Sequence, residues 1–191
     1  MRRTQYLSLA VAVLLLVGYG LAAPVITKAD VGRSYRAYFI DRTQVGWHTT
    51  SYDVPEDQGI DFSRVGKPQW VRALGGLSEP EPAGTWTDAR QGEAASIRYR
   101  VPFEGQVCVR LLVSPSPDNV GGVSYLQMGA ESRAFTTPVT APKWHSFSIL
   151  LEQPTALVRV FPGVTERMSA RDARIIGLLL LRLIVTPGVC A

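Results

Sequence analysis

The residues best suited by type and spacing to chemistry lie in one short segment. The segment "GGLSEPEPAGTWTDAR", residues 75–90, contains the carboxylates Glu79, Glu81 and Asp88 together with Trp86. Glycoside hydrolysis needs a general acid with a base or nucleophile, and an aromatic ring can stack on the sugar. One function that this segment predicts is therefore a glycan-active hydrolase or transferase.

The same segment also has a non-catalytic interpretation, which we favour. Prolines on both sides of Glu81 hold the backbone extended, so the carboxylates of Glu79 and Glu81 tend to point apart. Gly84 allows a tight turn, and Trp86 begins the next strand with a large apolar ring. In this interpretation Glu81 accepts hydrogen bonds from backbone N–H groups of the turn. We predict a turn that organises the start of a β-sandwich, with no catalytic residue.

Other catalytic and metal-binding motifs do not occur in the sequence. It contains no G-x-S-x-G, and its two histidines, His48 and His145, do not stand in H-x-x-x-H or H-E-x-x-H spacing. The two cysteines do not form a C-x-x-C pair. We expect no metal site, no cofactor and no serine-hydrolase activity.

The composition predicts one turn-rich globular domain that does not bind nucleic acid. Hydrophobic residues make up 46% of the 191 and charged residues 19%, which is too apolar for a disordered chain. The formal net charge of +4 includes Arg2 and Arg3 at the N-terminus. No Lys/Arg cluster or zinc-finger spacing appears, so the features of a nucleic-acid-binding protein are missing.

Alternation of apolar and polar residues predicts an all-β fold, an antiparallel β-sandwich or jelly roll. In "ASIRYRV", Ile97, Tyr99 and Val101 fall on one face of a half-buried strand. Further strand-like segments are separated by turns rich in Gly, Pro, Asn and Asp, and they occupy residues 106–113, 123–128, 132–137, 144–151, 156–161 and 175–185. The last is too short to span a membrane and contains Arg182, so we predict a core strand buried on both faces.

The N-terminus predicts a hydrophobic helix that directs export. Residues 6–23 are almost entirely apolar and follow Arg2 and Arg3. The domain organisation predicted is a signal anchor or signal peptide over residues 1–23, a lead-in or stalk over 24–59, and a β-sandwich domain over 60–191. We expect a single inner-membrane anchor with the β-domain in the periplasm; the alternative is a cleaved, secreted or periplasmic protein.

Export changes the interpretation of the two cysteines. Cys108 lies in a strand-like segment, and Cys190 is the penultimate residue. A disulfide between them is allowed in an oxidising compartment, where it would close a long loop. The alternative is a buried strand thiol and a free terminal thiol, and two cysteines alone do not decide between these states.

Two motifs resemble a known bacterial family. "GLSEPEPAGTWTDA", followed later by "FPGVTERMSARDARIIGLLLLRLIV", is similar to the all-β domain at the C-terminus of phosphoglycerol-transferase-like and related membrane glycosyltransferase proteins. The residues that match its first motif are Gly76, Leu77, Ser78, Glu81, Gly84, Trp86, Thr87 and Asp88. Those that match its second motif are Asp172, Arg174, Ile176, Gly177, Leu178 and Leu180. Leu77, Ala83 and Ala89 depart from the usual aromatic, aromatic and glycine.

The resemblance implies a jelly-roll module outside the membrane that is accessory to envelope glycan or glycerophosphate-glycan metabolism. We expect the chain to be the accessory part without a catalyst, binding an envelope carbohydrate or a polytopic membrane glycosyltransferase. The motif residues expected to be structural are Gly76, Ser78, Gly84, Thr87, Asp172, Arg174 and Gly177. The candidate ligand surface comprises Glu81, Trp86, Asp88, Arg90 and Trp144, with Arg98 as a further candidate.

Overall fold

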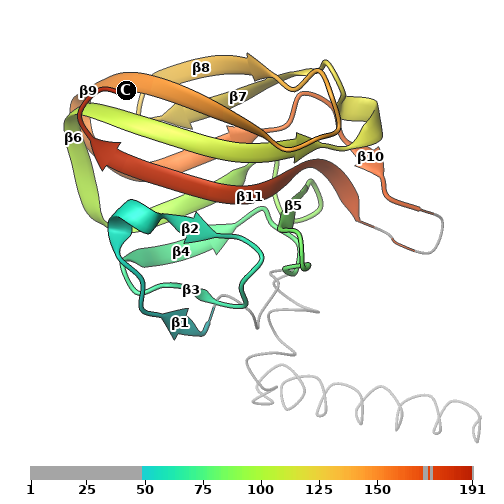
Figure 1. Cartoon of the computed structure of the whole chain (residues 1–191), viewed down its shortest axis with the longest axis horizontal. Coiled ribbons are helices and arrows are strands. Elements are labelled where there is room, and N and C mark those ends of the chain that lie inside the picture. The colour runs from blue at the N-terminus through green and yellow to red at the C-terminus, as the bar shows by residue number, and fades with distance from the viewer. Residues whose placement is uncertain (1–48, 170–171, 173, 191) are drawn as a thin grey trace, which may run out of the picture.

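Three long strands form the frame of the fold in the computed structural model, which describes residues 49–169, 172 and 174–190 (Figure 1). They are β6 (Ala95–Pro115), β9 (Lys143–Phe161) and β11 (Ile175–Pro187). β6 pairs antiparallel with β9 from Ala95 opposite Val160 to Val113 opposite Lys143. The second half of β6 also pairs antiparallel with β11.

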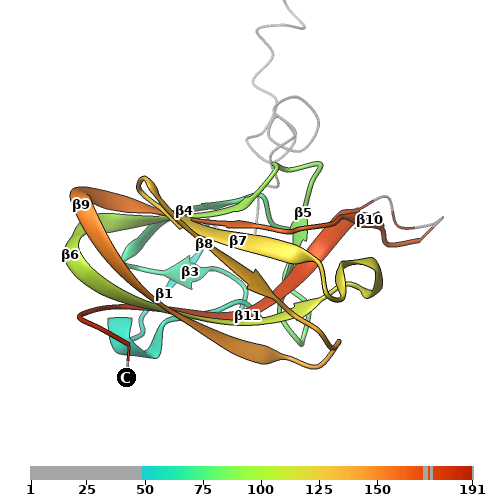
Figure 2. The same ribbon diagram turned by 90° about the horizontal axis from the view of Figure 1, so that it is seen from above.

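The long pair β6–β9 passes from one layer of the fold to the other. Its register shifts between Arg98 and Phe103 and again between Phe103 and Gly105. Before the shifts, β6 pairs with β4 (Val71–Gly75), and the corresponding part of β9 pairs with β7 (Val123–Met128), which pairs with β8 (Glu131–Thr136). Strands that bend in this way can belong to both layers of a sandwich. The result is an antiparallel β-sandwich, as the sequence predicts (Figures 1 and 2).

The bends also correct the predicted strand list. The segments 95–101 and 106–113 are parts of one strand, β6, and the segments 144–151 and 156–161 are both parts of β9. Pro102 and Gly105 lie at the bend of β6, and Pro154 lies at the facing bend of β9. These residues interrupt the alternation in the same way as the residues of a turn do.

Alternate side chains of the long strands form the core between the layers. The residues that are at most 1% exposed include Ile97, Val109, Leu111, Val113, Ile149, Val158, Val160, Leu178, Leu180 and Leu183. β11 is buried on one face and half-buried on the other, not buried on both. A register shift between Leu180 and Arg182 places Arg182 at the surface, where it lies 3.9 Å from Asp61.

Short elements cover one edge and one end of the sandwich. β2 (Ile60–Asp61), β5 (Thr85–Asp88) and β10 (Glu166–Arg167) all pair with β11. β1 (Ser51–Tyr52) pairs in parallel with β3 (Lys67–Pro68), and the 3-10 turns are η2 (Glu56–Gln58) and η3 (Pro117–Asn119). Trp70 Nε1 donates to the carbonyl of Val54 at 2.8 Å, so residues just before β2 pack on the domain.

The hydrophobic helix predicted over residues 1–23 lies outside the described residues, as does most of the lead-in predicted over 24–59. Within the part of the chain that the structure describes, no helix has the length and apolar character needed to cross a membrane.

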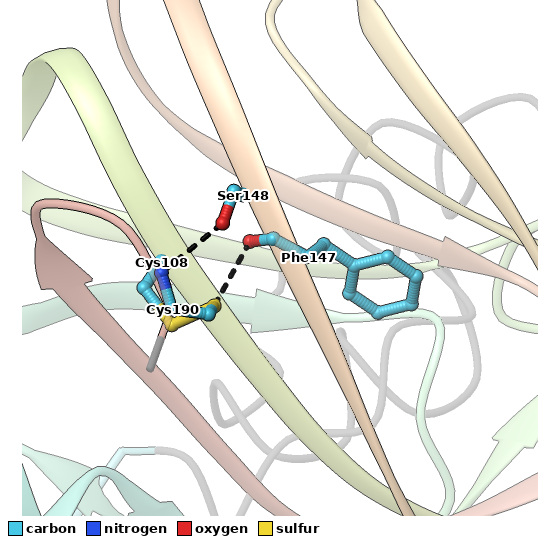
Figure 3. The surroundings of a disulfide bond; sticks show 4 residues. All are labelled: Cys108, Phe147, Ser148 and Cys190. Atoms are coloured by element: carbon cyan, nitrogen blue, oxygen red, sulfur yellow. Dashed lines mark hydrogen bonds between the residues drawn. A yellow bond between two sulfur atoms is a disulfide. The ribbon is translucent and has the colours of Figure 1, made fainter.

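A disulfide joins Cys108 on β6 to Cys190, just beyond β11 (Figure 3). The pairing of the two strands brings these ends together, because Thr186 of β11 lies opposite Cys108. The backbone N–H of Cys190 also donates to Ser148 Oγ on β9 at 3.1 Å. Cys190 is therefore joined to β6 by the disulfide and to β9 by a hydrogen bond.

Replacing both cysteines with alanine should lower the free energy of unfolding by about 2–4 kcal/mol, because the bridge closes a loop with a sequence separation of 82 residues. Urea unfolding with and without a reducing agent measures this. The wild-type midpoint should fall under reduction, while that of the double variant should not move. Equal wild-type midpoints in both conditions would show that the disulfide does not stabilise the fold.

Candidate functional site

The segment with the predicted carboxylates is a β-hairpin that ends in a tight turn. Its arms are joined by a backbone hydrogen bond from Ser78 N–H to the Trp86 carbonyl at 2.9 Å. At the tip, Glu81 and Gly84 exchange two backbone bonds of 2.7 and 3.0 Å. Pro82 follows Glu81 in this turn, where its restricted φ fits. The turn that the sequence predicts is confirmed.

The carboxylate of Glu81 binds side chains, so the prediction that it accepts bonds from turn amides is wrong. Glu81 Oε2 accepts from Trp86 Nε1 at 3.3 Å, and Oε1 accepts from Arg174 Nη1 at 2.6 Å. The physical reason lies in the turn, where the N–H of Gly84 already donates to the backbone carbonyl of Glu81. The side chain of Glu81 is left free to bind across to Arg174.

Arg174 joins two carboxylates, Glu81 and Asp172. Its Nη2 and Nε donate to Asp172 Oδ2 at 2.6 and 2.9 Å, while Nη1 binds Glu81. The hydrogen bonds from Arg174 lower the pKa of Asp172 to about 2, and Asp172 in turn raises the pKa of the Arg174 guanidinium. A carboxylate held ionised in this way is a poor general acid at neutral pH. The cluster binds the hairpin to the chain that precedes β11.

Asp88 and Glu79 do not join this cluster. Asp88 is fully buried, and its Oδ1 accepts from the backbone N–H groups of Arg90 and Ile175 at 3.1 and 3.2 Å. The guanidinium of Arg90 donates to Asp88 Oδ2 at 2.9 Å. Glu79 is exposed. The predicted carboxylates therefore do not converge on one groove, and Asp88 is not accessible to a ligand.

Two glycines of the resemblance motifs lie where a side chain would collide with backbone or with proline. Gly76 has φ +68°, and a Cβ there would lie 1.9 Å from the carbonyl oxygen of Ala94. A Cβ on Gly177 would lie 2.4 Å from Cβ of Pro162. Each motif thus contains a glycine that the surrounding chain packs against too closely for a side chain.

The hydroxyl groups of the first motif bind the hairpin internally and to β11. Ser78 Oγ accepts from the Trp86 N–H at 3.3 Å, and Thr87 Oγ1 accepts from the Leu178 N–H at 2.9 Å. Both residues are buried. The Ser78 hydroxyl therefore joins the two arms of the hairpin, and the Thr87 hydroxyl joins the hairpin to β11. Both roles are structural.

Trp144 and Arg98, the other candidates for the ligand surface, lie on other strands. Trp144 is 38% exposed on β9, and the guanidinium of Arg110 lies 5.0 Å from the centre of its ring. Arg98 is exposed on β6 opposite Leu157 of β9. Within residues 49–169, 172 and 174–190, no hydrogen bond or ring contact links either residue to the hairpin, and no cluster of metal-ligating side chains occurs.

An aromatic pocket of about 390 Å³ lies at the bend of β6, away from the hairpin. The rings of Trp70 and Tyr99 stack with centroids 5.7 Å apart, and Phe103 meets Tyr99 edge-on at 4.8 Å. The remaining lining residues are Glu56, Val101, Pro102, Glu104, Val107 and Pro187. The alternation of β6 gives no sign of this pocket, and the only signal is the cluster of Pro102, Phe103 and Gly105 between two strand-like segments.

The hydroxyl of Tyr99 is a buried donor without a partner in the described structure. Tyr99 is 6% exposed, and its oxygen forms no hydrogen bond there. Burial raises the pKa of this hydroxyl, and the negative charge of Glu56 raises it further, so it remains protonated. An unsatisfied buried hydroxyl costs on the order of 1–3 kcal/mol.

Replacing Asp172 with asparagine should weaken the hairpin cluster and change the response to acid. The folded-state pKa of Asp172, about 2, lies below its ordinary value of 3.8, so its contribution is present above pH 4 and lost as pH falls toward 2. Urea unfolding between pH 2 and 6 should show lower stability for Asp172→Asn at pH 6 and a shallower decline below pH 4. The control is Asp53→Asn, an exposed position. Parallel curves for Asp172→Asn and wild type would contradict this role.

Comparison with solved structures shows a weak likeness to family 29 carbohydrate-binding modules. A CBM29-2 mutant complexed with cellulohexaose is 11% identical with a TM-score of 0.46, and the alignment covers 68% of this chain and 89% of that one. A CBM29-2 mutant complexed with mannohexaose is 14% identical with a TM-score of 0.45, covering 68% and 91%. At these values the likeness carries no conclusion about a ligand.

Sequence comparison identifies the family. No curated protein matches the chain. The link to phosphoglycerol-transferase-like proteins, which the motifs suggest, is not tested by these comparisons and stays a prediction. The family model for a domain of unknown function, DUF7024, matches residues 48–187, which include every strand described above. The chain therefore belongs to the DUF7024 family.

Proposed function

We propose that this domain is a non-catalytic module that binds carbohydrate in the pocket formed by Trp70, Tyr99 and Phe103. The observation that carries the proposal is the group of three aromatic side chains and two carboxylates, those of Glu56 and Glu104, that line one pocket. Sugars present apolar C–H faces that pack on aromatic rings and hydroxyls that need directed partners. This pocket offers both.

The size and charge of the pocket fit one or two sugar units. Its volume of about 390 Å³ lies at the lower end of the range for small-molecule sites. Glu56 and Glu104 line it, and their carboxylates are acceptors for sugar hydroxyls. A neutral oligosaccharide end or a short internal stretch is the ligand that this arrangement favours.

The alternative, a glycan-active hydrolase or transferase that uses Glu79, Glu81 and Asp88, has less support. Glu81 is engaged by Arg174, Asp88 is buried, and Glu79 is exposed away from both interactions. The candidate ligand surface around Trp86, Arg90 and Trp144 is likewise divided between the hairpin and β9. We therefore place binding at the bend of β6 in this proposal.

Binding should depend on the pocket residues and not on Trp144, an exposed tryptophan outside the pocket. Against a panel of neutral gluco- and manno-oligosaccharides, Phe103→Ala and Trp70→Ala should weaken binding at least about tenfold, because each removes a stacking surface. Glu104→Gln should weaken it several-fold while leaving the fold intact, because only a carboxylate that lines the pocket is changed. Calorimetry measures each affinity.

Trp144→Ala is the matched control, since it removes an exposed tryptophan outside the pocket. Failure of every oligosaccharide to bind, or equal losses in Trp144→Ala and Trp70→Ala, would exclude this pocket as the site. Release of new reducing ends during incubation would show that the domain is an enzyme instead of a binding module.

We further propose that the domain is exported and held at the inner membrane, with the β-sandwich in the periplasm. The apolar residues 6–23 behind Arg2 and Arg3 support an anchor or signal peptide. The Cys108–Cys190 disulfide supports an oxidising compartment. In this location the module would serve envelope glycan metabolism, with an envelope carbohydrate as ligand and a polytopic membrane glycosyltransferase as partner.

Fractionation of bacteria that express the full chain tests this location. The protein should be found with the inner membrane, and added protease should digest the β-domain only after the outer membrane is made permeable. Deletion of residues 6–23 should leave the protein in the cytoplasm with reduced cysteines. Recovery of the full chain in the soluble cytoplasmic fraction would refute export, and purification from membranes without a glycosyltransferase would refute that partner.

A further inference from the structure

The outer face of one sheet layer contains a group of arginines without ion-pair partners. Arg98 on β6 and Arg159 on β9 are exposed, and neither forms a salt bridge or side-chain hydrogen bond within residues 49–169, 172 and 174–190. Arg72 on β4 and Arg100 on β6 are exposed on the same strands. We call these four residues the arginine face.

The strand register brings these charges close together. Ser96 lies opposite Arg159 and Leu157 lies opposite Arg98, so Arg98 and Arg159 are diagonal neighbours on one face of the sheet. The Cα atoms of diagonal neighbours in an antiparallel pair are about 7–8 Å apart, a distance that long side chains can span. Two like charges at this spacing oppose folding, which makes the pair a candidate for a role outside stability.

Nearby acidic side chains do not neutralise the arginine face. The strand segments of this layer contain one carboxylate, Glu131, and its oxygen lies 2.7 Å from Arg133 in an ion pair. Burial lowers the pKa of Lys67, and the charge of Arg100 lowers it further. Among the described residues these four arginines form no salt bridge, and the strand segments of this layer contain more basic than acidic side chains.

A shallow polar pocket and an aromatic pair lie beside these charges. The pocket has a volume of about 160 Å³ and is lined by Gln127, Gly129, Thr155, Leu157 and Arg159. Two register positions from the Gln127–Arg159 pair, Tyr125 of β7 lies opposite Phe161 of β9, and Tyr125 is 45% exposed. The face thus combines guanidinium groups, amide and hydroxyl groups, and an exposed aromatic ring along neighbouring strands.

We propose that the arginine face binds an acidic polysaccharide, a chain whose sugars bear carboxylate or phosphate groups. The guanidinium groups of Arg98 and Arg159 match such anions in charge and in their paired hydrogen-bond donors. Gln127 offers donors and an acceptor for sugar hydroxyls, and Tyr125 offers a stacking surface. The exported location proposed above, which the disulfide supports, favours an envelope glycan over a nucleic acid.

This surface is distinct from the aromatic pocket, so it extends the proposed function to a second kind of ligand. The pocket is lined by Glu56 and Glu104, which would repel an anionic sugar. The arginine face lies on the outside of the sheet and is suited to an extended charged chain. The two sites can be tested separately.

The test uses the full chain in detergent micelles, with polygalacturonate as the probe and neutral dextran for comparison. The variant Arg98→Gln/Arg159→Gln should bind polygalacturonate at least about tenfold more weakly than wild type. The charge-matched control Arg110→Gln/Arg167→Gln changes two exposed arginines outside this face and should alter binding less than twofold. Wild-type affinity should fall between about 50 and 300 mM salt, and fall less steeply in the first variant.

Several results would overturn the proposal. Equal losses in the two double variants would mean that only net charge matters, and equal binding of dextran would mean that the anionic groups are not recognised. Tighter, Arg98- and Arg159-dependent binding to phosphatidylglycerol vesicles or to single-stranded DNA would assign the face to a different partner. Circular dichroism of each variant must match wild type. Trp70→Ala should leave polygalacturonate binding unchanged, which separates this test from that of the pocket.

Discussion

The antiparallel pairing of β6 with β9 through their bends is the interaction on which the rest of the structure depends. Because the two strands remain paired on both sides of the bend, each contributes core side chains to both layers of the sandwich. β4 and β7 attach to the pair before the bend, and β11 attaches after it. The aromatic pocket also forms here, since Tyr99, Phe103 and Val107 follow one another along β6 through the change of register.

The carboxylate-rich hairpin has a different task from the one its composition first suggests. It supplies β5 to the edge of β11 and is held there by Asp88, Thr87 and the Glu81–Arg174 ion pair. Glu81, Asp88, Asp172 and Arg174 each meet an opposite charge or a backbone donor. Charges that are satisfied in this way stabilise a particular docking geometry and have little capacity left for a substrate.

The sequence predicts the fold class well because alternation is a local property. The segments at 95–101 and 106–113 carry the period of a strand, and the structure places strand β6 there. Local patterns could not distinguish a bend within a strand from a turn between strands, because proline and glycine mark both. The pocket escaped prediction because Trp70 and Phe103 are far apart in the chain and line one pocket only when β4 pairs with β6 just before the bend.

The position of the disulfide has a consequence for the energetics of any ligand that binds at the bend. Val107 and Pro187 both line the pocket, they lie opposite each other in the β6–β11 ladder, and Val107 is the neighbour of Cys108. One wall of the pocket is thus covalently closed at its end before a ligand arrives. The conformational entropy of that wall is lost during folding, so ligand binding need not order it, and preorganisation of this kind favours affinity without adding a contact.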